Sequence, residues 1–527
     1  MRDIHLPGRS TVHGTGGAAA TSQPLATLAA IDMLRAGGNA LDAAISACAV
    51  QCVTEPNGTG IGGDCFAMYW INSERRLVAI NGSGHAPAAL TSEWLLAQGL
   101  RAIAGDSVHS VTIPGAVDAW CRLNADHGRL SMAEVLEPAI RYADSGFALG
   151  PCIATEWAAA TQKLARNPNT ARQYLRDGQA PSAGDLWRHP QLAETLRAIA
   201  TNGRDAFYRG PVAHDMVTSL RSLGGVHTLE DFAVERSTYV TPIASSYRGV
   251  ELIQMPPNSQ GAVMLLIMNI LAGFDLTKFP PQSAERFHLL AEATRLAFEV
   301  KEAIGDPAFS DVSVEPFLTD AFAKSMQQRI RPDRAGSIPA AAAAGGRDTV
   351  YVAVVDADRN VCSFINSLYM QFGSGLTSET SGVLFHNRGI GFKVAPGHPA
   401  SVAPRKRPPH TILPGLAMRA GRPWLAFGVK GAAYQPIGQA QILTNLIDYG
   451  MDLQAAIDDA RCAYNEGHVD VERGISDAVR RGLTALGHRV VETALPLGGA
   501  QCVAIDWERG TLSAASDSRK DGLALCY

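Results

Sequence analysis

The sequence predicts an α/β fold, because two kinds of pattern alternate along it. Apolar stretches of helical length alternate with short runs of β-branched and aromatic residues that are bounded by turn residues. In addition, 46% of the 527 residues are hydrophobic and 18% are charged, which is typical of a globular protein with a large core. Length alone favours roughly three domains, but it is a weak guide.

Two helices are predicted near the N-terminus. The first runs from Gln23 to Arg35 and ends before Gly37-Gly38. Asn39 is a typical N-cap for the second, Ala40 to Val53. The residues of this second helix are almost all apolar, so we expect it to be buried on most sides.

The glycine-rich loop that follows resembles a nucleotide-binding motif only in its spacing. Gly58, Gly60 and Gly63 satisfy GxGxxG, the fingerprint of dinucleotide sites. That fingerprint needs a strand before it and a helix after it. Here a helix precedes the glycines and a predicted strand, Cys65 to Ile71, follows them. We therefore expect no nucleotide cofactor.

The middle of the chain continues the alternation. Residues 77–87, LVAINGSGHAP, predict a strand that ends in a turn. The 14-residue run from Gly261 to Phe274 is apolar except for Asn269, and it is too short to span a membrane. It predicts a buried helix. Further helices are predicted over residues 283–305 and 437–449.

A hairpin is predicted over residues 349–369. The preceding residues 335–346, AGSIPAAAAAGG, offer little to anchor a packed segment and predict a mobile linker. A buried strand then begins at Thr349, residues 356–360 supply a turn, and residues 361–369 form a return strand. Thr349 has two interpretations: a β-branched residue that merely opens a strand, or a nucleophile at a strand end.

Charge and cysteine content exclude several classes of partner. Lys and Arg number 46 against 50 Asp and Glu, and no basic block suits nucleic acid. The nine cysteines are scattered without CxxC spacing, so we expect buried thiols rather than a metal site. The N-terminal residues lack an apolar secretory segment. Together these features predict a cytoplasmic protein with no membrane partner.

Several motifs occur in the order found in one family. They are TEPNGTGIGGD at 54–64, DTVY at 348–351, FINSLY at 364–369 and GVKGAAYQP at 428–436. From about residue 10 to Tyr527, the chain resembles the γ-glutamyltranspeptidase family of N-terminal-nucleophile hydrolases. The resemblance implies a four-layer αββα sandwich, in which helices enclose two stacked sheets, and it implies no metal or organic cofactor.

By this resemblance, the chain cuts itself between Asp348 and Thr349. Thr349 would then carry both a hydroxyl nucleophile and a free α-amine, whose reference pKa of roughly 7.7–8.0 lets it accept a proton near neutral pH. The backbone N–H groups of Gly431 and Ala432 would form the oxyanion hole, although Lys430 stands where Pro or Met is common. No other nucleophile motif is present in the sequence.

The same resemblance implies how the cleaved pieces associate. The fragments 1–348 and 349–527 would be interleaved parts of one αββα domain, each the partner of the other. A small-molecule amide is the implied substrate. A homo-oligomer of such heterodimers is a further alternative.

The predicted substrate pocket departs from the glutathione-processing members of the family. Ser83 stands where those members have an arginine that holds the glutamyl α-carboxylate. Arg388 and Gly391 occupy the positions that hold the α-amino group, and neither side chain can accept a hydrogen bond from an ammonium. His410 and Thr411 replace a pair of serines. The pocket therefore favours a small anionic amide without an α-ammonium.

Two further residues complete this pocket. Ser367 and Tyr369, at the end of the predicted hairpin, are expected to contact the substrate. Arg388 has two interpretations, since an arginine fork suits a substrate carboxylate but also suits a structural ion pair.

Three hypotheses for function follow. Within the family the chain resembles the oxamate amidohydrolase-like sub-group, whose reaction converts oxamate to oxalate and ammonia. The first hypothesis is therefore a self-cleaving amidohydrolase that acts on oxamate or a similar small acid amide through a threonine acyl-enzyme. The second is a γ-glutamyltransferase or glutathione hydrolase that uses other contacts. The third, of another class, is a non-catalytic family member that serves assembly or binding.

Overall fold

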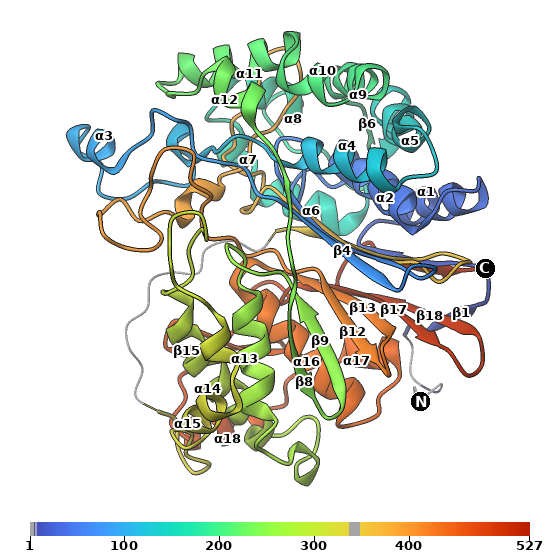
Figure 1. The fold of residues 1–527 in the computed structure, drawn as a ribbon, viewed down its shortest axis with the longest axis vertical. Coiled ribbons are helices and arrows are strands. Elements are labelled where there is room, and N and C mark those ends of the chain that lie inside the picture. Colours follow the sequence, from blue (N-terminus) through green and yellow to red (C-terminus); the bar gives the residue numbers. More distant parts are fainter. Residues whose placement is uncertain (1–4, 6–7, 337–347) are drawn as a thin grey trace.

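The structure, a computed structural model, describes residue 5, residues 8–336 and residues 348–527. Within these residues, two seven-stranded sheets stack face to face and helices cover the outer face of each (Figure 1). The fold is thus a four-layer αββα sandwich. Most of the predicted linker, residues 337–346, lies outside the described residues.

The first sheet is antiparallel throughout and carries Thr349 at the start of one of its central strands. In spatial order its strands are β19 (Leu523–Cys526), β2 (Ala18–Thr21), β10 (Val350–Val355), β11 (Val361–Ser367), β3 (Asp64–Ile71), β4 (Arg76–Gly82) and β7 (Thr238–Tyr239).

The second sheet is also antiparallel. In spatial order its strands are β1 (Val12–Gly14), β18 (Thr511–Ser516), β17 (Gly499–Asp506), β13 (Arg422–Lys430), β12 (Gly415–Arg419), β9 (Val250–Gln254) and β8 (Ile243–Tyr247). Both sheets therefore combine strands from before and after residue 349.

One helical layer covers the first sheet. Its inner helices, which contact the strands, are α1 (Pro24–Arg35), α2 (Ala40–Thr54) and α4 (Ala116–His127). Around them lie α3 (Ser92–Ala97), α5 (Met132–Ser145), α6 (Pro151–Ala159), α7 (Thr161–Leu164), α8 (Pro168–Tyr174), α9 (Pro190–Asn202), α10 (Arg204–Tyr208), α11 (Pro211–Ser222), α12 (Leu229–Val234), and the short pair β5 (Phe147–Ala148) and β6 (Leu186–Trp187).

The other helical layer covers the second sheet. Its inner helices are α13 (Gly261–Leu271), α16 (Gln435–Ile447) and α17 (Leu453–Asp458). Outside them lie α14 (Ala284–Lys301), α15 (Asp320–Gln327), α18 (Asp477–Ala485), and a small sheet of β14 (Cys462–Asn465), β15 (His468–Val471) and β16 (Val490–Glu492). Among the described residues, no helix combines the length and apolarity needed to span a bilayer.

Helix α2 shows why the sequence pattern was informative. Its residues are all buried, as the continuous apolar run predicted. The Asn39 side chain accepts hydrogen bonds from the N–H groups of Leu41 and Asp42, and the Asp42 carboxylate accepts one from the N–H of Asn39. This capping box fixes where the helix begins.

Strand β10 has no polar face because both of its faces are covered. Val350, Val352 and Val354 point into the core beneath the helices, whereas Tyr351 and Ala353 point between the two sheets. A strand buried on both sides has a continuous apolar sequence rather than an alternating one. The same burial keeps the residue before it, Thr349, out of solvent.

The two sheets approach closely beside Thr349. A Cβ atom placed on Gly428 of β13 would lie 2.3 Å from Cδ2 of Tyr351, so only glycine fits there. This contact brings the end of β13 against the beginning of β10. Residues 430–432, which follow β13, therefore lie near Thr349.

The predicted element boundaries differ from the observed ones by a few residues. The helix predicted over 283–305 ends at Lys301, ahead of Gly305 and Pro307. The helix predicted over 437–449 begins at Gln435, because Pro436 suits the first turn of a helix. All nine cysteines are described and none forms a disulfide; six of them are buried.

Candidate active site

Thr349 lies in a buried cluster of oxygen atoms at the end of the first sheet. Its Oγ1 is 2.5 Å from the carbonyl oxygen of Asp348 and 3.0 Å from Oγ of Ser367. Oγ of Ser367 is itself 3.1 Å from the same carbonyl oxygen. The backbone N–H of Tyr369 donates to Oγ of Ser367 over 2.9 Å. The nucleophile predicted from the sequence therefore touches the carbonyl that it would attack.

The β10–β11 hairpin creates this arrangement. Val350 pairs with Asn366, so the residues beyond that pair, Thr349 and Ser367, face each other across the strand ends. The register is set at the turn, where the Asp356 carboxylate accepts a hydrogen bond from the N–H of Asn360 over 2.9 Å. The turn residues noted in the sequence thus position the two hydroxyl groups.

Two hydroxyl groups converge on the carbonyl oxygen of Asp348, which can only accept hydrogen bonds. Oγ1 of Thr349 donates to this oxygen, and Oγ of Ser367 can donate either to the same oxygen or to Oγ1 of Thr349. A donor from Ser367 would stabilise negative charge on the carbonyl oxygen as Thr349 reacts.

Gln435, the first residue of α16, adds a hydrogen-bond donor from the side of the second sheet. Its Nε2 lies 3.5 Å from Oγ1 of Thr349, at the limit of a hydrogen bond. Its Oε1 accepts the N–H of Leu413 over 2.8 Å, which turns the amide nitrogen towards Thr349. Gln435 was not among the residues predicted from the sequence; the one available signal was its position directly after the Gly431–Tyr434 run.

Gly431 and Ala432, the residues predicted to form an oxyanion hole, lie just beyond β13. Both have positive φ angles, 129° at Gly431 and 50° at Ala432. Ala432 opens a short 3₁₀ helix, Ala432–Tyr434, whose first N–H groups have no acceptor within the helix. The carbonyl oxygen of Ala432 accepts a hydrogen bond from the side chain of Gln260 over 2.9 Å. The loop therefore has backbone donors of the kind that an oxyanion hole needs.

A cavity of about 190 Å³ brings four of the predicted pocket residues together. Those four are Tyr369, Arg388, His410 and Thr411. Its other lining residues are Asn258, Gln260, Lys301, Glu302, Ile304, Ile390, Gly391, Phe392, Lys393, His398, Ala400 and Pro409. Tyr369 links this cavity to the nucleophile, because its own N–H binds Ser367.

Arg388 is buried in the wall of this cavity with unused hydrogen-bonding capacity. One of its terminal nitrogens donates to Oγ1 of Thr411 over 2.9 Å, and its guanidinium carbon lies 3.5 Å from the centre of the Tyr369 ring. Its Nε has no hydrogen-bond partner among the described residues. No described carboxylate forms an ion pair with Arg388, so the alternative of a structural ion pair receives no support.

The cavity is electropositive. Lys301 also lines it, and burial together with the nearby Arg388 cation lowers the pKa of Lys301 to about 8. Burial likewise lowers the pKa of Arg388. Glu302 is the acidic member of the lining, and it already pairs with Lys393 and His398. An anion bound beside Arg388 and Lys301 would therefore relieve a repulsion between two buried cations.

His410 contributes to the cavity wall but has no free nitrogen. Its Nδ1 accepts the N–H of Ile412 over 3.3 Å, so Nε2 carries the proton and donates to Asp64 over 2.9 Å. Burial lowers the pKa of His410 to about 4, so the ring is neutral at neutral pH. Burial would raise the pKa of Asp64, but His386 and His410 outweigh it and hold the pKa well below its usual range. His410 thus shapes the cavity rather than offering a donor to it.

Ser83 lies behind the cavity rather than in it. Its Oγ accepts a hydrogen bond from Nδ2 of Asn258 over 3.0 Å, and Asn258 lines the cavity. Its carbonyl oxygen accepts from Nε of Arg407 over 2.9 Å. Of the six predicted substrate-binding residues, Ser83 and Ser367 are therefore the two that do not line the cavity, and they reach it through Asn258 and Tyr369.

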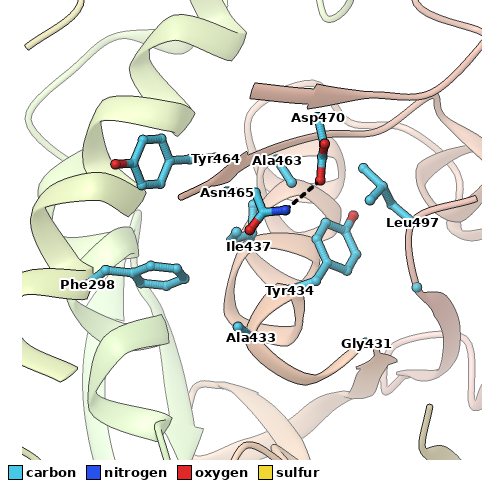
Figure 2. A pocket seen from close by; sticks show the side chains of 11 residues that line it. Phe298, Gly431, Ala433, Tyr434, Ile437, Ala463, Tyr464, Asn465, Asp470 and Leu497 are labelled. Atoms are coloured by element: carbon cyan, nitrogen blue, oxygen red, sulfur yellow. Dashed lines mark hydrogen bonds between the residues drawn. The ribbon is translucent and has the colours of Figure 1, made fainter. Parts of the chain in front are cut away.

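A second, smaller cavity of about 50 Å³ lies behind Gly431 (Figure 2). Figure 2 shows that the side chains around it include Phe298 of α14, Ile437 of α16 and Tyr464 of the small sheet, together with Tyr434 from the turn before α16. Asn465 donates to Asp470 at one side over 2.9 Å. Its size suits water rather than a substrate.

Comparison with known proteins agrees with these features. The family model described as gamma-glutamyltranspeptidase matches residues 26–527. The chain belongs to the γ-glutamyltranspeptidase family. It is similar to the glutathione hydrolase-like YwrD proenzyme of Bacillus subtilis, with 37% identity over 98% of this chain and 99% of that protein.

Two further relatives bear on the enzyme class. The oxamate amidohydrolase proenzyme of Klebsiella pneumoniae is 32% identical over 97% of this chain and 99% of its own. The crystal structure of a cephalosporin acylase from Bacillus halodurans has 36% identity and a TM-score of 0.94, covering 100% of this chain and 98% of that chain. The predicted family, fold class and enzyme class are confirmed: this is an N-terminal-nucleophile hydrolase of the γ-glutamyltranspeptidase family.

The glycine-rich loop has a structural role in this γ-glutamyltranspeptidase-family chain. Helix α2 precedes it and strand β3 follows, as expected from the sequence. A Cβ on Gly58 would lie 3.5 Å from the carbonyl oxygen of Thr349, and one on Gly63 would lie 2.4 Å from that of Ser367. Gly63 therefore lets the loop pack closely against the backbone of Ser367, whereas a side chain at Gly58 would make only an ordinary contact with Thr349.

Proposed function

We propose that the chain cleaves its own Asp348–Thr349 bond and that the mature enzyme hydrolyses a small anionic amide through an acyl-enzyme on Thr349. The observation that carries this proposal is the contact of Oγ1 of Thr349 with both the Asp348 carbonyl oxygen and Oγ of Ser367. A hydroxyl, its acceptor and the target carbonyl are held together without solvent between them.

Self-cleavage would proceed in two balanced steps. Oγ1 of Thr349 attacks the Asp348 carbonyl carbon, its proton passes by way of Ser367 to the leaving nitrogen of Thr349, and the C–N bond breaks. The product is an ester between Asp348 and Thr349. Water then adds to the ester carbonyl, which returns a proton to Oγ1 and leaves a carboxylate at Asp348 and an amine at Thr349. No reagent other than water is consumed.

Turnover would reuse the same atoms. The neutral α-amine of Thr349 takes the proton from Oγ1 as that oxygen attacks the substrate amide, and then gives it to the departing amine. The backbone N–H groups of Gly431 and Ala432 would stabilise the oxyanion, and each such donor is worth on the order of 3–4 kcal/mol. Water hydrolyses the acyl-enzyme and regenerates Thr349.

The electropositive cavity supports an acid amide as the substrate. A carboxylate could accept hydrogen bonds from the unpaired Nε of Arg388 and from the terminal nitrogens, in the bidentate geometry that guanidinium favours. Gly391 lines the cavity without a side chain, so no acceptor for an α-ammonium is found at that position. Oxamate, a carboxylate joined directly to an amide, fits both requirements.

A γ-glutamyl compound such as glutathione is the second candidate. The 37% identity to a glutathione hydrolase-like relative favours it, since that relative matches nearly the whole chain. It would need a different acceptor for the α-ammonium. Glu302 is the carboxylate that lines the cavity and could serve, but only by leaving Lys393 and His398.

Two measurements test the proposal. Denaturing gels should show fragments of 348 and 179 residues in place of the 55.8 kDa chain, with Thr349 at the new N-terminus by sequencing. Ammonia release from oxamate should then exceed glutamate release from glutathione. Turnover of glutathione with none of oxamate would favour the second candidate. An intact chain that acts on neither amide would support the non-catalytic alternative.

We further propose that fragments 1–348 and 349–527 stay together after cleavage. Each sheet combines strands from both fragments, so separation would expose the core between them. An oligomer of such heterodimers stays a prediction, to be tested by light scattering of the cleaved protein. The nine free cysteines support the predicted cytoplasmic location, which cell fractionation would check.

A further inference from the structure

A buried cluster of charges surrounds the side chain of Asp348. Nζ of Lys430 lies 3.1 Å from Oδ1 of Asp348 and 3.7 Å from a carboxylate oxygen of both Glu55 and Glu156. The side chains of Lys430, Glu55 and Asp348 are 3%, 0% and 7% exposed. Lys520 pairs with the other oxygen of Glu156. Ion pairs this deep are costly to build, so their placement beside the scissile bond requires an explanation.

The carboxylates on either side of Lys430 are themselves held in place. Oγ of Ser22 donates to Glu55 over 2.6 Å, and Nε2 of Gln51 donates to the same oxygen over 3.3 Å. Asn57 donates to the Glu156 oxygen that faces Lys430. These contacts come from α2, α6 and the loops beside them, so several elements hold the carboxylates that surround Lys430. Nζ of Lys430 itself faces these carboxylates in ion pairs and makes no hydrogen bond among the described residues.

Charge also favours an ionised Lys430. Burial alone would lower the pKa of its ammonium, but Glu156, Asp348 and Glu55 outweigh that effect and raise it. Burial raises the pKa of Asp348, and Lys430 acts against that rise. The Lys163 ammonium also attracts the Asp348 carboxylate. It is held by donating a hydrogen bond to the carbonyl oxygen of Gln371 over 2.6 Å. In the part of the chain that the structure describes, the cation nearest to the Asp348 carboxylate is Lys430.

Asp348 is therefore anchored at both ends. Its carbonyl oxygen contacts the hydroxyls of Thr349 and Ser367, and its carboxylate pairs with Lys430. Fixing both groups fixes the rotation about the Cα–C bond, and that rotation decides which face of the carbonyl meets Oγ1 of Thr349. We propose that Lys430 is a positioning residue for self-cleavage, which requires a carboxylate at residue 348. This inference rests on the proposed cleavage before Thr349.

Cleavage also changes the balance of positive and negative charges in the cluster. While the chain is intact, the described residues of the cluster carry three carboxylates, on Glu55, Glu156 and Asp348, and two ammonium groups, on Lys430 and Lys520. Cleavage adds the new α-carboxylate of Asp348 to this acid-rich site. If Asp348 departs, Lys430 and Lys520 face Glu55 and Glu156, two charges of each sign. Lys430 thus loses its partner at residue 348 without being left unpaired.

The test compares rates of self-cleavage in purified precursor variants. Asp348→Asn keeps the size of the side chain but removes its charge, and it leaves the remaining cluster balanced, so the precursor should fold. Lys430→Met removes the other partner. We expect each single variant to cleave at least 10-fold more slowly than wild type, because a misplaced reacting group alone can cost about 100-fold. The double variant should be no slower than the slower single one, since both changes break the same contact.

Matched variants separate positioning from general damage to the cluster. Lys520→Met removes a buried ammonium from the same cluster but not from Asp348, and we expect cleavage within about threefold of wild type. Lys430→Arg retains the charge and should restore most of the rate that Lys430→Met loses. Near-ultraviolet circular dichroism and melting temperature of each uncleaved precursor report whether it has folded.

Three outcomes would overturn the inference. Wild-type cleavage of a folded Asp348→Asn precursor would show that the carboxylate is not used. Additive losses in the double variant would show that Lys430 and Asp348 act separately, and equal losses in Lys520→Met would point to a merely structural cluster. A wild-type chain that is never cut before Thr349 would instead refute the proposed function itself.

Discussion

Oγ of Ser367 lies 3.0 Å from Oγ1 of Thr349, although 18 residues separate the two in the chain. Ser367 closes strand β11 and Thr349 precedes strand β10, so the hairpin register alone sets this distance. The pair therefore joins the proposed nucleophile to the only other hydroxyl that contacts the Asp348 carbonyl oxygen among the described residues.

Replacing Ser367 by alanine should slow self-cleavage by about 100-fold or more, the usual contribution of one positioned proton donor or acceptor. The Ser367 hydroxyl contacts both Oγ1 of Thr349 and the Asp348 carbonyl oxygen, and water cannot replace it in a site where Thr349 is 1% exposed. A gel time course of freshly purified precursor measures the rate.

Ser363→Ala is the matched control for Ser367→Ala. Ser363 lies on the same face of β11, is equally buried, and hydrogen-bonds to the Gly415 carbonyl oxygen instead. It should lower stability by about 1 kcal/mol without slowing cleavage of the folded precursor. Similar cleavage rates in the two variants would show that the Ser367 hydroxyl has no special role.

The sequence was sufficient for much of this architecture because local signals and the family motifs agreed. The hairpin from residue 349 could be anticipated from the Asp356–Asn360 turn, and α2 from Asn39 and the apolar run after it. Gln435 could not, because its amide reaches Thr349 only after β13 and β10 pack against each other. Lys430 was visible as a departure from the motif, but the three buried carboxylates around it come from distant segments.

Arg388 offers a test of substrate charge. In the mature enzyme, Arg388→Leu should lower kcat/KM for an acid amide about 10- to 100-fold, because a hydrogen bond to a charged group contributes about 1.5–3 kcal/mol. The lower kcat/KM should come mainly from a higher KM. The change should be small for the corresponding neutral diamide, which has no carboxylate to bind.

Arg419→Leu is the control for Arg388→Leu. Its guanidinium carbon also lies over an aromatic ring, 3.6 Å from the centre of Trp424, but the residue is exposed and outside the cavity. Kinetics on both amides should be those of the wild type. Equal losses on acid and neutral amides in Arg388→Leu would mean that Arg388 maintains the cavity without binding a carboxylate.

Acid should destabilise the fold through buried histidines. Burial lowers the pKa of His189 to about 4, against roughly 6.5 in an unfolded chain, and its Nδ1 caps α9 by accepting the N–H of Leu192. Between these two pKa values the unfolded state binds more protons, so stability is fully present above pH 6.5 and falls as the pH drops towards 4. The loss approaches about 1.4 kcal/mol per pH unit for this one residue.

His189→Asn should reduce that dependence, since asparagine also caps helices but does not titrate. Thermal unfolding of the single-chain Thr349→Ala protein at pH 7, 6 and 5 measures it. The same substitution at His214, which is exposed on α11, is the control for the change of side chain. An unchanged slope in His189→Asn would show that protonation of His189 does not drive acid unfolding.

The loop at residues 431 and 432 should respond oppositely to two reciprocal substitutions. Ala432→Gly relieves an alanine held at φ 50°, a region that costs L-residues roughly 1–2 kcal/mol, and it keeps the backbone N–H. Stability should rise slightly and turnover should be retained.

Gly431→Ala places a Cβ at φ 129°, 3.2 Å from Cδ1 of Tyr434, so the loop must move. A displaced loop would misalign its donors, and kcat should fall about 100-fold or more, the effect of losing one oxyanion-hole donor. Melting temperatures and single-turnover rates of the two mature enzymes measure these effects. Full turnover in a folded Gly431→Ala enzyme would place the oxyanion hole elsewhere.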